Sequence, residues 1–140
     1  MTDPANIDYL VIVQCHLVKQ YCPGYFCERA FHHRTGGFAD WPKDRTPRMI
    51  SLTCGGCCGR PLHRKLALLI RKLAARESIA KERIHVQLPS CITKDNYHGP
   101  PCPHLDYLKT LLDRLGLGYA QDTAISARAE QRRAEGRYRS

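Results

Sequence analysis

The 140-residue chain has no long apolar segment and no start typical of an exported protein. A membrane-spanning helix needs roughly 20 consecutive apolar residues, and no stretch approaches that length. The opening residues, MTDPANIDY, contain neither the basic nor the apolar region of a signal peptide. We therefore expect a cytoplasmic protein that does not cross a membrane.

Acidic residues are few, since 13 Asp and Glu stand against 22 Lys and Arg, which gives a formal net charge of +9. This excess permits contact with nucleic acid or other anions. The chain lacks a recognisable nucleic-acid-binding motif, however, and its few aromatic residues are not arranged for base stacking. A solvated basic surface is the preferred interpretation, and nucleic-acid binding ranks below the other functions considered. No protein partner can be named from the sequence.

Cysteine, by contrast, is abundant, with eight in the chain. In a reducing cytosol this number indicates metal binding or thiol catalysis rather than disulfides. A hydrophobic content of 43% also suffices for a core without covalent cross-links. Each cysteine lies where an apolar extended run ends or where a helix is expected to begin, so their positions in the fold decide their chemistry.

Short apolar runs alternate with amphipathic segments, which predicts an α/β fold. The predicted strands are residues 9–14, 48–53 and 84–88 and a short segment around Tyr119. The predicted helices cover about 22–33, a long segment from about Pro61, and 102–116. Right-handed crossovers then give a small three-layer α/β/α sandwich with a mostly parallel sheet of about four strands. We assign residues 1–119 to this domain and residues 120–140 to a basic tail rich in Arg, Ala and Glu, a frayed helix or disordered.

Cys54 and Cys57 form a C-x2-C pair with two glycines between them, at the junction of a predicted strand and a predicted helix. This spacing lets both sulfur atoms reach one ion, and the glycines permit the tight turn. A helix start also favours the thiolate, the form that binds metals and attacks disulfides. The pair therefore predicts a thiolate site without deciding which kind.

The remaining cysteines strengthen the case for a metal. The carboxyl ends of parallel strands share one edge of a sheet, so the thiols that follow them are expected to converge at the C-terminal edge. Cys22 and Cys27 are predicted to join this site, to form a second one, or to act as a redox pair. For Cys58 alone, an inert buried thiol is preferred. The candidate metal ligands are Cys15, Cys22, Cys27, Cys54, Cys57, Cys91, Cys102 and His104.

Zinc is the preferred metal, because convergent thiolates and a histidine suit tetrahedral coordination. An iron–sulfur cluster is the variant of this interpretation, although no spacing matches the common ferredoxin patterns. The main alternative is a thiol–disulfide oxidoreductase in which Cys54 attacks and Cys57 resolves. It leaves the convergence of the other cysteines unexplained. Whether the protein is an enzyme stays open.

Several motifs in one order resemble those of the CGGC-domain family of small prokaryotic proteins. The resemblance covers about residues 8–118 and implies a metal-binding, preferentially zinc-binding, domain. Two departures bear on the ligand set: Cys58 stands where the family has a proline, and Asp122-Thr123-Ala124 stands where it has Gly-Thr-His. The matching segments are Cys15, Cys22-Pro23-Gly24 with Cys27, Gly37-Phe38-Ala39, Cys54-Gly55-Gly56-Cys57, Cys91 between serine and isoleucine, and Cys102-Pro103-His104.

Overall fold

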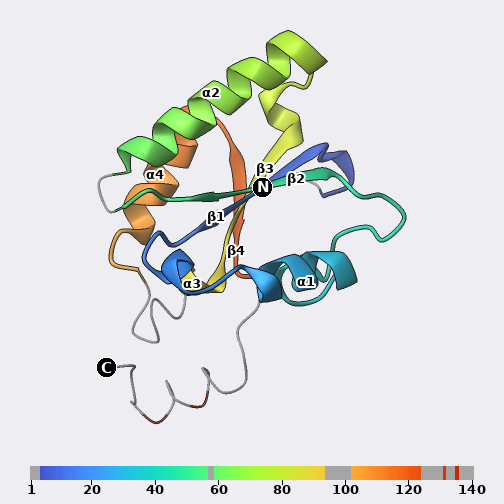
Figure 1. Cartoon of the computed structure of the whole chain (residues 1–140). Helices are drawn as coiled ribbons and strands as arrows, with labels where there is room; N and C mark the ends of the chain where they lie inside the picture. Colours follow the sequence, from blue (N-terminus) through green and yellow to red (C-terminus); the bar gives the residue numbers. More distant parts are fainter. Residues whose placement is uncertain (1–3, 57–58, 94–101, 124–130, 132–134, 136–140) are drawn as a thin grey trace.

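A computed structural model of the chain describes residues 4–56, 59–93 and 102–123 and the single residues 131 and 135. Helices and strands alternate, and four strands form one sheet in which every pairing is parallel (Figure 1). The elements are η1 (Pro4–Asn6), β1 (Tyr9–Gln14), η2 (Val18–Gln20), α1 (Tyr25–His33), η3 (Gly36–Phe38), β2 (Arg48–Thr53), α2 (Arg60–Glu77), η4 (Lys81–Arg83), β3 (Ile84–Leu88), α3 (Ser90–Thr93), α4 (Leu105–Leu115) and β4 (Gly118–Gln121). The predicted α/β class is confirmed.

The strand order is β2-β1-β3-β4, which fixes where a ligand crevice can form. The chain passes from β1 to its neighbour β2, and then crosses back over β1 to build β3 and β4 on the other side. The connections therefore diverge between β1 and β3. In open α/β sheets, ligands bind in the crevice outside the carboxyl ends of the strands at this position. Cys15 follows β1 and Cys91 lies just beyond β3, so both stand at this crevice.

The central strand β1 supplies both layers of the core, because successive side chains of a strand point to opposite faces. On one face, Val11 and Val13 join the leucines of α2 and α4. On the other face, Leu10 and Ile12 pack with Phe31 of α1 and with residues of the η3 region. Figure 1 shows the same arrangement, with α2 and α4 on one side of the sheet and α1 on the other. None of the described helices combines the length and apolar character needed to cross a membrane.

The two helices expected to begin at Cys-Pro pairs begin later in the chain. Gly24 is the N-cap of α1 with φ 84°, a left-handed conformation that keeps Cys22 and Pro23 outside the helix. His104 is the N-cap of α4, and Cys102 lies in the preceding turn, where its carbonyl accepts the N–H of Leu105 at 3.2 Å. The prediction that these helices begin at residues 22 and 102 is therefore wrong. Both cysteines occupy turns, which leaves their thiols outside the regular helix surface.

His85 of β3 is a buried polar residue in the layer next to α1. Its Nε2 lies 2.8 Å from Oε1 of Gln87, whose amide nitrogen donates to the carbonyls of Gln121 and Asp122. Because that nitrogen is the donor end of the amide, Oε1 must accept, and the proton of the neutral imidazole lies on Nε2. Nδ1 is buried without a hydrogen-bond partner among the described residues. Burial lowers the pKa of His85, and the Gln87 bond opposes this shift.

We expect acidification to destabilise the protein through His85. The imidazole is neutral in the folded state, whereas the unfolded chain takes up a proton below an ordinary pKa of about 6.5. The free energy of unfolding should therefore fall between pH 7.5 and 5.5, by at most about 1.4 kcal/mol per pH unit for one proton. Urea denaturation at several pH values measures this, and His85→Gln should flatten the slope. Exposed His63→Gln is the control, and an equal effect of both substitutions would contradict the assignment.

Candidate metal centre

Backbone hydrogen bonds hold the cysteine segments against the carboxyl edge of the sheet. The N–H of Cys54 donates to the carbonyl of Gln14 at 2.9 Å, which places the start of the CGGC turn beside the end of β1. The N–H of Cys102 donates to the carbonyl of Ile92 at 2.8 Å, next to Cys91. Segments distant in sequence therefore meet at one edge, as expected. No disulfide joins any two of the six described cysteines.

Three other thiols act electrostatically on Cys91, which lies at the crevice between β1 and β3. Burial raises the pKa of the Cys91 thiol to about 12, and a backbone hydrogen bond with Cys15 opposes this. Charge on Cys27, Cys15 and Cys22 raises the pKa further, so these three sulfur atoms lie within electrostatic range of Cys91. The C-x4-C pair of Cys22 and Cys27 thus lies within electrostatic range of Cys91.

The hydroxyl of Thr123, two residues beyond the end of β4, contacts Cys27. Oγ1 of Thr123 lies 3.1 Å from its Sγ. The same oxygen accepts the N–H of Ser90 at 3.4 Å, which leaves the hydroxyl hydrogen available for sulfur. Burial raises the pKa of Cys27, whereas the hydrogen bonds from Thr123 and Gln14 act in the opposite direction. Thr123 thus orients Cys27 and favours its thiolate.

The turn that carries Cys22 to the crevice depends on glycine. Gly24 has φ 84°, and a Cβ there would lie 3.2 Å from Cδ of Gln14 and nearer still to its amide nitrogen. The same Gln14 amide interacts with Cys27. A side chain at position 24 would therefore strain the backbone and displace a group that contacts the thiol. The Cys-Pro-Gly segment is explained by this close approach rather than by a helix start.

The predicted ligands differ in how the structure places them. Cys15 is buried, whereas Cys22, Cys54, Cys91 and Cys102 are half-buried and pack against the core layer of α2 and α4. Half-buried Cys27 packs on the opposite layer. His104 is half-buried at the start of α4. Cys57 lies outside the described residues, as does Cys58.

Within the part of the chain that the structure describes, no three Cys, His, Asp or Glu side chains are arranged closely enough to hold a metal ion. The donor chemistry nevertheless suits a soft metal, because the thiols of Cys15, Cys22 and Cys27 all lie within electrostatic range of Cys91. A complete coordination sphere therefore needs side-chain movement within this cluster, a ligand outside the described residues such as Cys57, or both.

Sequence reasoning did not identify Thr123 and Ser90 as parts of the site. They exchange two hydrogen bonds, since the N–H of Thr123 donates to Oγ of Ser90 at 3.2 Å and Thr123 Oγ1 accepts in return. This pair joins the segments that follow β3 and β4. Ser90 directly precedes Cys91, and Thr123 contacts Cys27. The available signal was positional, because each residue follows a predicted strand at the same sheet edge.

Comparison with known proteins gives one match. The model of the CGGC domain family matches residues 9–123, which is most of the chain. No curated protein and no solved structure matches this chain. The match spans all four strands and every described cysteine, in agreement with the resemblance seen in the motifs. The chain therefore belongs to the CGGC domain family.

Proposed function

We propose that this protein binds a metal ion, with zinc preferred, through cysteine thiolates at the carboxyl edge of the sheet. The single observation that carries the proposal is the electrostatic interaction of Cys91 with Cys15, Cys22 and Cys27. Several thiolates at close range repel one another, and a divalent cation among them removes that repulsion. These four are the preferred ligands. Cys54, Cys102 and His104 are further candidates, as is Cys57 by its place in the CGGC motif.

The raised pKa values favour a metal over a nucleophile at the centre of this cluster. A reactive cysteine needs a lowered pKa, whereas Cys91 has a pKa of about 12 and that of Cys27 is also raised. A metal ion can displace the thiol protons and stabilise the thiolates directly. The alternative oxidoreductase function would therefore use Cys54 and Cys57 and leave this cluster unused.

The number of protein ligands determines which role the metal plays. Four protein ligands to zinc would make the site structural or concerned with metal handling. Three protein ligands would leave a position for water, and bound zinc would then supply Lewis acidity. X-ray absorption at the zinc edge distinguishes the two by the count of sulfur neighbours. A cytoplasmic location remains part of the proposal.

Metal analysis of protein purified without oxygen tests the proposal. We expect a colourless sample with about one zinc per chain, consistent with a closed thiolate site. A brown sample that contains iron and sulfide would indicate an iron–sulfur cluster in place of zinc. Metal-free protein that resists loading with zinc, and in which Cys54 is alkylated fastest, would overturn the proposal in favour of redox chemistry.

Zinc affinity should also depend on pH in a defined direction. Because the pKa of Cys91 is raised to about 12, this thiol carries a proton near neutrality, and zinc must displace it. The apparent association constant should rise with pH between 6 and 8, by about tenfold per pH unit for each proton displaced. Competition against a chromophoric chelator at each pH measures the slope. An association constant that does not change with pH would contradict thiol ligation.

A further inference from the structure

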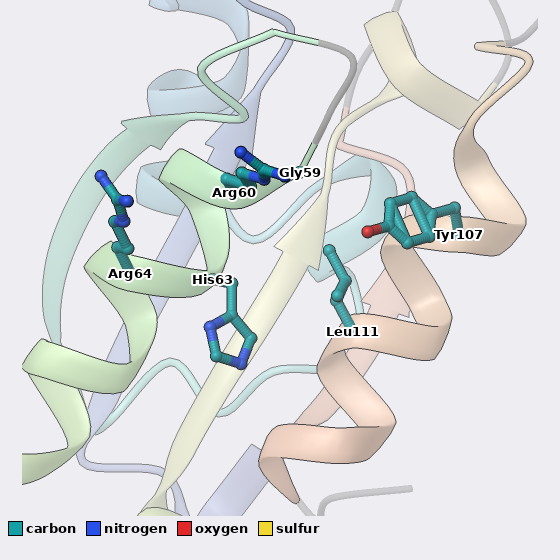
Figure 2. A pocket seen from close by; sticks show the side chains of 6 residues that line it. All are labelled: Gly59, Arg60, His63, Arg64, Tyr107 and Leu111. Carbon is teal, nitrogen blue, oxygen red and sulfur yellow. The ribbon is translucent and has the colours of Figure 1, made fainter.

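A second feature lies between the start of α2 and α4. A pocket of about 190 Å³ is lined by Gly59, Arg60, His63, Arg64, Tyr107 and Leu111 (Figure 2). Figure 2 shows the Tyr107 hydroxyl and the Leu111 side chain directed from α4 toward the first turns of α2. Pockets for drug-sized ligands measure about 300–1,000 Å³, so this volume suits a smaller molecule.

The charge of the pocket has one sign. Two arginines and a histidine line it, and none of its lining residues is acidic. The ion pairs found among the described residues use Arg45, Arg48 and Arg83, and none involves Arg60 or Arg64. Tyr107 is 43% exposed, and its hydroxyl has no hydrogen-bond partner in the described part of the chain. The Arg60 guanidinium and the Tyr107 hydroxyl are therefore available to an anion.

The position of the cations is also unfavourable without an anion. The first turn of α2 contains no acidic residue, although helix starts favour negative charge and disfavour positive charge. A bound anion would compensate both Arg60 and the partial positive charge of the helix end. The close packing of the two helices supports a defined shape, because a Cβ at Gly59 would lie 2.7 Å from Cδ1 of Leu111 and 3.1 Å from Cε2 of Tyr107.

We propose that this pocket binds a tetrahedral oxyanion, namely a phosphate group, either free or carried by a small molecule. Arg60 supplies the principal charge, Tyr107 a hydroxyl donor and His63 a further polar group, whereas Figure 2 shows the Arg64 side chain directed away from α4. Guanidinium groups suit phosphate because their N–H donors match its oxygen atoms. None of the lining residues is a candidate metal ligand, so this proposal does not rest on the metal proposal.

Isothermal titration calorimetry of the full chain with inorganic phosphate at constant ionic strength tests the proposal. We expect saturable binding of one phosphate per chain. Arg60→Gln should weaken it at least tenfold and Tyr107→Phe about threefold. Arg71→Gln removes the same charge from an exposed position farther along α2 and should leave the affinity unchanged. Circular dichroism confirms that the variants retain their helices.

A parallel titration with glycerol 3-phosphate identifies the form of the ligand. Tighter binding of this ester would indicate a phosphorylated small molecule, whereas equal affinity would indicate recognition of the phosphate group alone. Equal weakening by Arg60→Gln and Arg71→Gln would overturn the proposal, because general surface charge would then explain binding. It would also be overturned if neither probe showed saturable binding, or if phosphate bound only to zinc-loaded protein and irrespective of Arg60.

Discussion

Cys91→Ser is expected to abolish zinc retention during purification. Cys91 follows β3 at the crevice between β1 and β3, and Cys15, Cys22 and Cys27 lie within its electrostatic range. Replacing its sulfur by oxygen removes a soft ligand from the centre of the cluster. Loss of an outer-shell partner costs about 10–100-fold in metal affinity, so loss of a direct ligand should cost more. Zinc content and chelator competition measure the effect.

A set of further serine variants separates ligands from neighbouring cysteines. Cys54→Ser and Cys57→Ser should also prevent metal retention if the CGGC pair completes the coordination. Cys58→Ser is the matched control from the same loop and should have a smaller effect. Equal zinc content in Cys91→Ser, Cys54→Ser and Cys58→Ser would contradict the ligand assignment. Unchanged unfolding midpoints of the metal-free variants would show that the difference lies in metal binding and not in folding.

Gly37→Ala should cause the largest loss of stability among single methyl additions. A Cβ at this position would lie 2.6 Å from the carbonyl carbon of Asp122, closer to its oxygen, and 3.0 Å from Nε2 of Gln87. The N–H of Gly37 also donates to the carbonyl of Thr123 at 2.9 Å. The two closest atoms belong to the backbone of Asp122, and the Gln87 amide is held in place by hydrogen bonds to the carbonyls of Gln121 and Asp122. Overpacking typically costs about 1–3 kcal/mol, and we expect a value at the upper end of this range because the contact is with backbone atoms.

The same substitution should alter the cysteine site. Displacement of Asp122 and Thr123 would separate Oγ1 of Thr123 from Sγ of Cys27 and would disturb the Ser90–Thr123 pair. We therefore expect weaker zinc binding together with the lower unfolding midpoint. Ala39→Ser adds one atom at an exposed neighbouring position and should change stability by no more than about 0.5 kcal/mol. An unfolding midpoint unchanged in Gly37→Ala would show that the segment yields easily and would refute the argument.

The local sequence pattern predicts most of the secondary structure, because periodicity and strand composition are local properties. Residues 9–14, 48–53 and 84–88 form strands as expected, and Tyr119 lies in the fourth. Leu62, Leu66 and Leu73 are buried on α2, as their helical spacing indicates. The errors concern the starts of α1 and α4. There the left-handed Gly24 and the turn after Cys102, which depend on tertiary contacts, decide where each helix begins.

The sequence predicted where in the fold the candidate site lies better than it predicted which residues contact one another there. Parallel strands must end at one edge, which is why Cys15, Cys54 and Cys91 could be assigned to the same edge of the sheet from their positions alone. The sequence does not reveal that Thr123 reaches Cys27 or that Gly37 touches Asp122, since each pair joins segments more than 80 residues apart. Such contacts depend on how the layers pack.

The amino-acid sequence alone determined the α/β class, the number of strands and the gathering of thiols at one sheet edge. These features follow from the alternation of short apolar runs with amphipathic segments along the chain. Tertiary structure alone decided the strand order, which puts the divergence of the connections between β1 and β3. It also decided which thiols interact and brought the cationic start of α2 against Tyr107. The physical reason is that interaction between side chains depends on distance in space, which only the packing of helices on the sheet sets.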